Sequence, residues 1–192
     1  MELYTADEFQ SMVSKAYSEQ DRAILLFLYD TGARATEVAN LRWKDVDLED
    51  RTANILKSKG KKPRKVPFGK STEISLRSLL RDMPEPNHPV FISRLHKPYT
   101  RSGIRFVVKR SCLRAGVPMR KELVHSIRHT AACNLVEATN GDALYVQKVL
   151  GHKKITTTMI YIRHWEDKRV LAKAKTFKSP GDRLAFNAPP PR

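Results

Sequence analysis

The 192-residue sequence predicts an α+β domain that is mostly helical and carries one small antiparallel β-sheet. Apolar residues recur at helical spacing over most of the chain, whereas short β-like pieces occur only at 46–48, 52–57 and 64–68. Capping residues and glycine stops separate the helical segments. We expect one domain with its own core over residues 1–178 and a disordered, proline-rich tail over 179–192.

The first expected helix begins at a capping box formed by Thr5 and Glu8. Its apolar face comprises Phe9, Met12, Val13, Ala16 and Tyr17. A second helix over residues 21–29 is apolar on nearly all sides, so we expect it to be buried. It ends at residues 30–32, and a short helix over 37–41 follows.

Gly60 supplies a turn between the second and third β-like pieces, which indicates a hairpin. Thr100 and Asp142 are good N-caps, and Gly116 and Gly151 are good helix stops. The remaining expected helices cover residues 71–81, 100–115, 126–138, 142–150, 156–162 and 167–175.

The charge of the chain indicates a polyanionic partner. Lys and Arg number 36 against 20 Asp and Glu, a net charge of +16, which favours nucleic acid over a membrane surface. A ribosome-associated or merely soluble basic protein is the alternative. No apolar run approaches the roughly 20 residues that span a bilayer, and no signal peptide is evident. Cys112 and Cys133 lie in apolar helical patterns and predict reduced core thiols of a cytosolic protein.

Three separated motifs hold residues suited to a phosphodiester: TGARATEVANLRW from Thr31, HSIRHTAA from His125 and LGHKKITTTMIYIRH from Leu150. Arginine forks neutralise phosphate oxygens through bidentate hydrogen bonds, and Arg34 and Arg128 are the candidates. His125 lies about one turn before Arg128, so both side chains can face one phosphate. Taken singly, Arg34 could be an exposed arginine at a helix start and His125 a surface histidine.

The third motif adds a histidine and a tyrosine. His152 follows Gly151, and a glycine stop lets the chain turn sharply and direct an imidazole to a site. Tyr161 could be an ordinary residue of an amphipathic helix. A tyrosine ionises only near pH 10, so we expect surrounding positive charge to make Tyr161 a competent nucleophile.

In this order the motifs resemble the tyrosine recombinases, the integrase family that cuts and rejoins DNA, over residues 5–175. The resemblance implies a catalytic set of Arg34, Lys59, His125, Arg128, His152 and Tyr161, with Glu37 supporting Arg34. Lys59, in the turn of the hairpin, is expected to be the general acid for the leaving 5′ oxygen. His129 is expected to serve structure, because Arg128 already fills the matching position.

A basic run surrounds Lys59. We expect Lys57, Lys61, Lys62 and Arg64 to contact the DNA backbone, although a run of this kind can also be a solvated charged surface. No metal and no cofactor is implied, because the protein–DNA ester stores the bond energy.

The function expected from the resemblance is site-specific recombination of double-stranded DNA through a 3′-phosphotyrosine. We expect a monomer when free, a synaptic tetramer on DNA, accessory DNA-bending proteins, no membrane partner and a cytoplasmic, nucleoid-associated location. A type IB topoisomerase and a non-catalytic DNA-binding module are the alternatives. Larger family members carry an N-terminal domain that completes a clamp around DNA, so this chain is either a fragment or a naturally short form.

Overall fold

The computed structural model describes residues 2–56, 63–80, 85–94, 96–120 and 123–176. Within them, most residues of the regular elements are helical and a three-stranded antiparallel sheet lies at one edge, as the sequence predicts. The expected tail, the hairpin turn at Gly60 and residues 57–62 lie outside the described residues.

The N-terminal helices form the centre of the larger core. Helix α1 (Ala6–Ser14) has the expected capping box, with Thr5 accepting from the Glu8 N–H and Glu8 accepting from the Thr5 N–H. Helix α2 (Glu19–Thr31) buries residues on several faces and contacts α1 and three later helices. Gly32 ends α2 in the left-handed conformation, and the short α3 (Ala35–Ala39) follows.

A 3-10 turn, η1 (Trp43–Asp45), leads from α3 into the sheet. The sequence pattern did not predict this turn. Strands β1 (Val46–Asp47), β2 (Thr52–Ile55) and β3 (Arg64–Pro67) pair in sequence order. Ala53 faces Val66 in the register, and Ile55 faces Arg64. Helix α4 (Lys70–Arg77) then returns the chain to α2.

Helix α5 (Arg101–Ala115) begins at Thr100 and ends at Gly116, and α7 (Ala143–Leu150) begins at Asp142 and ends at Gly151, which confirms all four caps. Helix α6 (Leu123–Ala138) begins a few residues earlier than expected. The prediction of two helices after residue 155 is wrong, because α8 (Ile155–Ala174) is continuous. Residues 163–166, between the two expected helices, contain no glycine or proline to interrupt α8.

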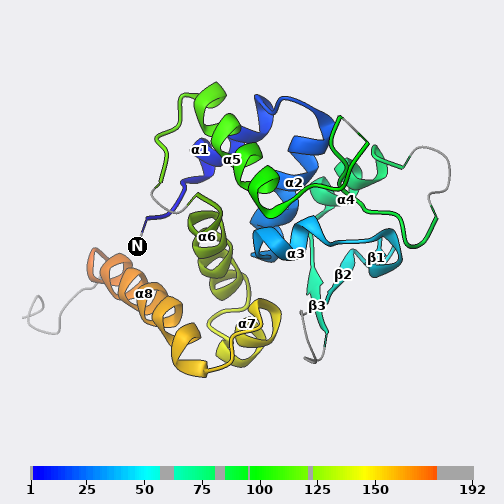
Figure 1. Cartoon of the computed structure of the whole chain (residues 1–192). Coiled ribbons are helices and arrows are strands. Elements are labelled where there is room, and N and C mark those ends of the chain that lie inside the picture. Colours follow the sequence, from blue (N-terminus) through cyan, green and yellow to red (C-terminus); the bar gives the residue numbers. More distant parts are fainter. Residues whose placement is uncertain (1, 57–62, 81–84, 95, 121–122, 177–192) are drawn as a thin grey trace, which may run out of the picture.

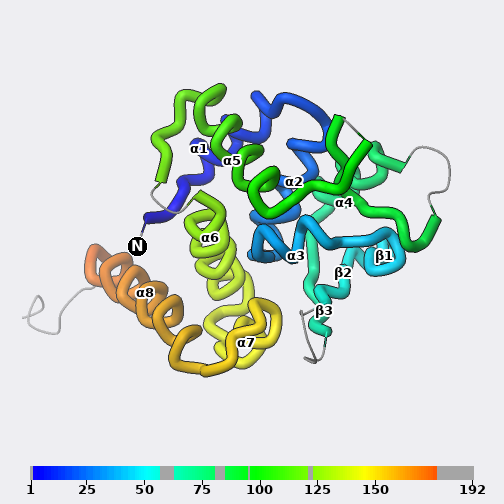
Figure 2. The backbone as a smooth tube through the Cα atoms, in the orientation of Figure 1, coloured from blue at the N-terminus to red at the C-terminus, as the bar shows by residue number. Residues whose placement is uncertain are grey.

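Helix α6 joins two hydrophobic clusters. It contacts α2 and α5 on one side and α7 and α8 on the other, as Figures 1 and 2 show. The larger cluster is built mainly from α1, α2, α5 and the sheet. The smaller cluster contains Ala132, Val136, Val146, Leu150, Tyr161 and Ile162. The three sequence motifs meet where α6 passes between these clusters.

Candidate active site

Arg34 is the N-cap residue of α3, directly after the turn that ends α2. Its backbone N–H donates to Glu37 Oε2 at 2.8 Å and its Nη1 to Glu37 Oε1 at 3.1 Å. The Arg34 side chain remains 42% exposed, so its guanidinium is held at one edge while its remaining donors face solvent. The carboxylate of Glu37 therefore orients Arg34.

Arg64 of strand β3 also binds the carboxylate of Glu37. Arg64 Nη1 and Nη2 donate to the two carboxylate oxygens at 2.8 and 2.7 Å, and its Nε donates to the Val149 carbonyl at 2.7 Å. Burial raises the pKa of Glu37, but the hydrogen bonds from Arg64 and Arg34 and their charges outweigh it and lower that pKa to about 2. Glu37 therefore stays ionised.

The expectation that Arg64 contacts the DNA backbone needs correction. Its side chain is only 4% exposed, and its guanidinium is already engaged by Glu37 and Val149. Within the alternating pattern of β3, position 64 faces inward, so the sequence neighbours of Arg64 in the basic run do not share its environment. Arg64 supports the site from behind instead.

Arg128 of α6 links the first and third motifs. It donates from Nη1 to the Gly32 carbonyl and from Nη2 to the Leu150 carbonyl, the latter at 2.7 Å. Burial and the neighbouring charges of Arg34 and Arg64 lower the pKa of Arg128 to about 10, which leaves it charged at neutral pH. One guanidinium thus fixes the turns that follow α2 and α7.

The approach of these two turns requires a glycine at position 32. Its φ is +58°, and a Cβ atom there would lie 2.8 Å from Leu150 Cδ2 and 3.3 Å from Ala131 Cβ. Both the backbone conformation and the space exclude a side chain without rearrangement. Gly32 therefore lets Arg34 approach Arg128.

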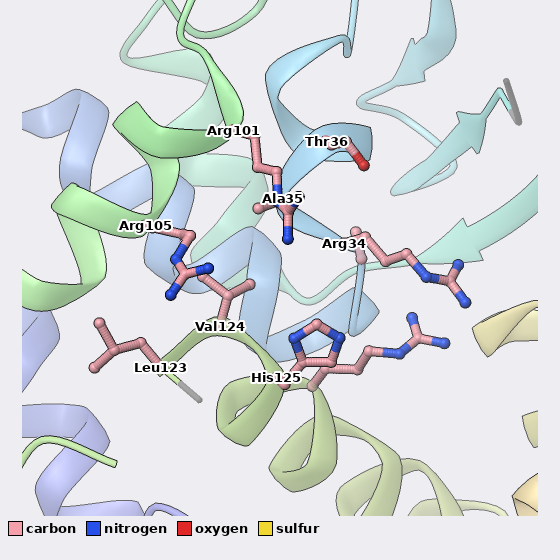
Figure 3. Close-up of a pocket in the computed structure, with 10 residues that line it drawn as sticks. Arg34, Ala35, Thr36, Arg101, Arg105, Leu123, Val124 and His125 are labelled. Carbon is pink, nitrogen blue, oxygen red and sulfur yellow. The ribbon is translucent and has the colours of Figure 1, made fainter. Parts of the chain in front are cut away.

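A basic cavity of about 430 Å³ opens beside these arginines, between α3, α5 and α6 (Figure 3). His125 is exposed on its wall, one helical turn before Arg128. Arg101 and Arg105 of α5 line the opposite wall, and sequence reasoning did not single them out. The cavity is suited to an anion, because four guanidinium groups border it.

His152 borders a second cavity, which it shares with Arg34. Gly151 ends α7 with φ of +66°, and the chain turns so that His152 Nδ1 lies 2.9 Å from Thr158 Oγ1. Burial and the charges of Arg128, Arg34 and Arg64 lower the pKa of His152 to about 4. His152 is therefore neutral at physiological pH and is held in one orientation by Thr158.

Tyr161 lies in the smaller cluster with only 4% of its surface exposed. Its ring is nearly parallel to that of His152, at 14° with centroids 6.1 Å apart. Burial raises the pKa of Tyr161, and the nearby charge of Arg128 offsets only part of that increase. Positive charge from Arg128 does reach Tyr161, as expected, but burial outweighs its effect on the pKa of the phenol.

The hydroxyl group of Tyr161 lies 2.7 Å from Nδ1 of His129. The sequence predicted only a structural role for His129. The separation of residues 129 and 161 in the sequence gives no sign that their side chains are in contact. Helix α6 presents Arg128 and His129 in different directions, because successive helical residues are about 100° apart. Arg128 faces the two turns while His129 faces α8.

The structure brings Arg34, Glu37, Arg128, His125, His152 and Tyr161 around one region. Lys57, Lys59, Lys61 and Lys62 lie outside the described residues. Among the residues that are described, no group of three or more His, Cys, Asp or Glu side chains is placed to hold a metal ion. No helix in the same ranges is long and apolar enough to cross a membrane.

Curated relatives match much of the chain. The tyrosine recombinase XerC of Corynebacterium glutamicum is 37% identical over 155 residues, which cover 79% of this chain and 49% of that protein. XerC of Pediococcus pentosaceus is 34% identical over 154 residues, with coverage of 76% and 50%. The chain thus spans about half the length of these relatives.

Solved structures share the fold. XerA recombinase superposes with a TM-score of 0.77 at 27% identity, over 92% of this chain and 66% of that one. XerH recombinase bound to its difH substrate gives a TM-score of 0.68 at 25% identity, over 84% and 50%. The fold is therefore that of a tyrosine recombinase catalytic domain. Residues 3–168 also match the model of the phage integrase family, and this chain belongs to that family.

Proposed function

We propose that this chain is a site-specific recombinase that cuts and rejoins DNA through a 3′-phosphotyrosine at Tyr161. The proposal rests on one observation: Tyr161 lies near Arg34, Arg128 and two histidines that come from separate segments of the chain. The chain also belongs to the phage integrase family. In the first transesterification Tyr161 Oη attacks phosphorus and releases a 5′ hydroxyl group. In the second, a 5′ hydroxyl from a partner duplex attacks the ester and frees the tyrosine.

The two arginines neutralise the non-bridging oxygens of the phosphate. Arg34 is anchored by Glu37 and keeps exposed donors, whereas Arg128 uses one N–H group on each of two backbone carbonyls and retains others. Anchoring of this kind is what transition-state stabilisation requires, because donors that are already oriented pay no cost of reorganisation during the reaction.

The histidines act as hydrogen-bond donors to the phosphate. His152 is neutral, and the contact between its Nδ1 and Thr158 fixes the ring that presents Nε2. His125 reaches the basic cavity from the wall of α6. Lys59 is the proposed general acid for the leaving 5′ oxygen, as the resemblance to the family implies.

Double-stranded DNA at a recombination site is the proposed substrate. XerH, one of the structural neighbours, is bound to such DNA, its difH substrate. The net charge of +16 supports the same partner. We extend the proposal to a monomer that assembles as a tetramer on DNA, with accessory DNA-bending proteins, in the cytoplasm and associated with the nucleoid.

A library of nicked duplexes tests this function. The nick lets a short fragment diffuse away after cleavage, so any covalent adduct accumulates, and randomised sequence around it removes the need to know the target. We expect an adduct in excess EDTA whose nucleotide maps to Tyr161, and none from Tyr161→Phe, which keeps the ring and removes the hydroxyl group.

Tyr145→Phe is the matched control, since Tyr145 is 40% exposed on α7 and should leave the adduct unchanged. An adduct that needs a divalent metal, or that persists in Tyr161→Phe, would show that this mechanism is wrong.

A further inference from the structure

The proposed reaction leaves one proton without a destination. Tyr161 must lose its hydroxyl proton as it attacks phosphorus, yet burial raises the pKa of this phenol. A base that contacts Oη is therefore needed, and its identity can be sought among the neighbouring side chains.

His152 is poorly placed for that task. Its Nδ1 is engaged by Thr158 at 2.9 Å, and its ring lies nearly parallel to the ring of Tyr161. Burial and three nearby arginines lower the pKa of His152 to about 4, so its affinity for a proton is weak. His125 is exposed on the wall of the basic cavity, whereas Tyr161 is buried in the smaller cluster.

His129 has the geometry that the others lack. Its Nδ1 lies 2.7 Å from Tyr161 Oη, the separation of a good hydrogen bond. The two rings are tilted by 41° with centroids 5.8 Å apart, so the nitrogen rather than the face of the imidazole meets the hydroxyl group. Among the residues that the structure describes, His129 is the side chain that hydrogen-bonds this oxygen.

We propose that His129 is a catalytic base that takes the Tyr161 proton on Nδ1. As the bond between Oη and phosphorus forms and the bond from phosphorus to the 5′ oxygen breaks, the phenol proton moves from Oη to Nδ1. The departing 5′ oxygen receives its proton from the general acid on the opposite side. In rejoining, His129 returns the proton to Oη. This role rests on the proposed function.

The tautomer of His129 decides whether it can act in this way. A base must present an unprotonated Nδ1, with the proton on Nε2, whereas an Nδ1–H group would donate to Tyr161 and could accept nothing. Nitrogen-15 NMR of the imidazole in the intact chain, without DNA, reads this directly at neutral pH. We expect the Nε2–H form, and an Nδ1–H form would overturn the proposal.

Cleavage kinetics give a second test. His129→Asn keeps a polar atom near the position of Nδ1 but cannot take up a proton at neutral pH. We expect adduct formation on the nicked substrate to fall by about 10²- to 10⁴-fold, with DNA binding unchanged. His164→Asn, elsewhere on the neighbouring α8, is the matched control.

Replacing Tyr161 by a fluorinated tyrosine, whose phenol ionises more readily, separates proton transfer from positioning. With the fluorinated tyrosine, His129→Asn should slow adduct formation by a smaller factor, because a phenol that ionises more readily depends less on a base. Full activity of His129→Asn, or an equal defect with both phenols, would assign His129 to positioning alone. A parent chain that forms no adduct would instead overturn the proposed function itself.

Discussion

Glu37 is the residue on which both sides of the arginine cluster depend. Its carboxylate accepts from Arg34 on one side and from the buried Arg64 on the other. Removing a charge from such a network leaves the partner arginine buried without compensation, which is more costly than losing a surface ion pair. We therefore expect Glu37 to affect folding as well as chemistry.

Glu37→Gln should lower the free energy of unfolding at neutral pH by about 3 kcal/mol. The folded pKa of about 2 lies below the ordinary value of 4.5, so the stabilisation is present above pH 4.5 and is lost as pH falls toward 2. Urea denaturation of parent and variant at several pH values should show the difference shrinking in acid. Glu85→Gln, on the surface, is the control; a constant difference would contradict this account.

Lys59 carries a prediction about the leaving group. If it protonates the 5′ oxygen, Lys59→Ala should slow cleavage of ordinary DNA by about 10²- to 10⁴-fold. A substrate with a 5′-bridging sulfur needs little protonation, so variant and parent should cut it at similar rates. Equal defects on both substrates, measured in single-turnover assays, would transfer the role to Lys57 or Lys61.

Residue types and spacing predicted most of the candidate site, because Arg34, Arg128, His152 and Tyr161 sit in dense motifs. The partnership of His129 with Tyr161 could not be predicted, since it depends on how α6 packs against α8. The burial of Arg64 was hidden for a similar reason. The residues of the basic run have similar side chains, so the sequence does not distinguish them. Only the alternation of inward and outward side chains along β3 shows that Arg64 points inward.

At the scale of elements, the turn between α2 and α3 packs directly against Leu150 of α7. Gly32 and Gly116 both end helices with positive φ, but a Cβ atom at Gly32 would strike Leu150, whereas one at Gly116 would meet nothing within 4 Å. The two positions therefore form a natural comparison between backbone strain alone and strain combined with overpacking.

Gly116→Ala should cost only the strain of the left-handed backbone, about 1 to 2 kcal/mol. Gly32→Ala should cost a further 1 to 3 kcal/mol or so, because Leu150 must move, and it should weaken adduct formation by displacing Arg34. Urea midpoints of both variants measure the difference. An equal loss of unfolding free energy in the two variants would mean that Leu150 moves aside without an energetic cost.

Caps and stops predicted the helix boundaries well, because Thr5, Thr100, Asp142, Gly116 and Gly151 act locally. The continuity of α8 was not predicted, although residues 163–166 contain no glycine or proline. Trp165, within the supposed gap, packs against the smaller cluster and helps α8 to continue. Caps and glycine stops thus predicted where helices end more reliably than the sequence predicted whether a helix continues.

At the scale of the whole molecule, charge dominates the expected interaction with DNA. A chain with net charge +16 should bind duplex DNA chiefly through contacts to the phosphates. We expect affinity for labelled duplex to fall steeply between about 50 and 200 mM salt and to vary little with sequence. Titrations that gave tight, site-specific, salt-insensitive binding would refute this.

The sharing of Glu37 between two arginines also sets the charge that a bound phosphate meets. The guanidinium groups of Arg34, Arg64 and Arg128, less the one carboxylate, leave two positive charges at the centre of the site. A phosphodiester carries one negative charge, whereas the five-coordinate phosphorus formed by a tyrosinate carries two. In the proposed reaction this excess of positive charge, to which Arg101 and Arg105 of the cavity wall add, therefore stabilises the transition state more than the substrate.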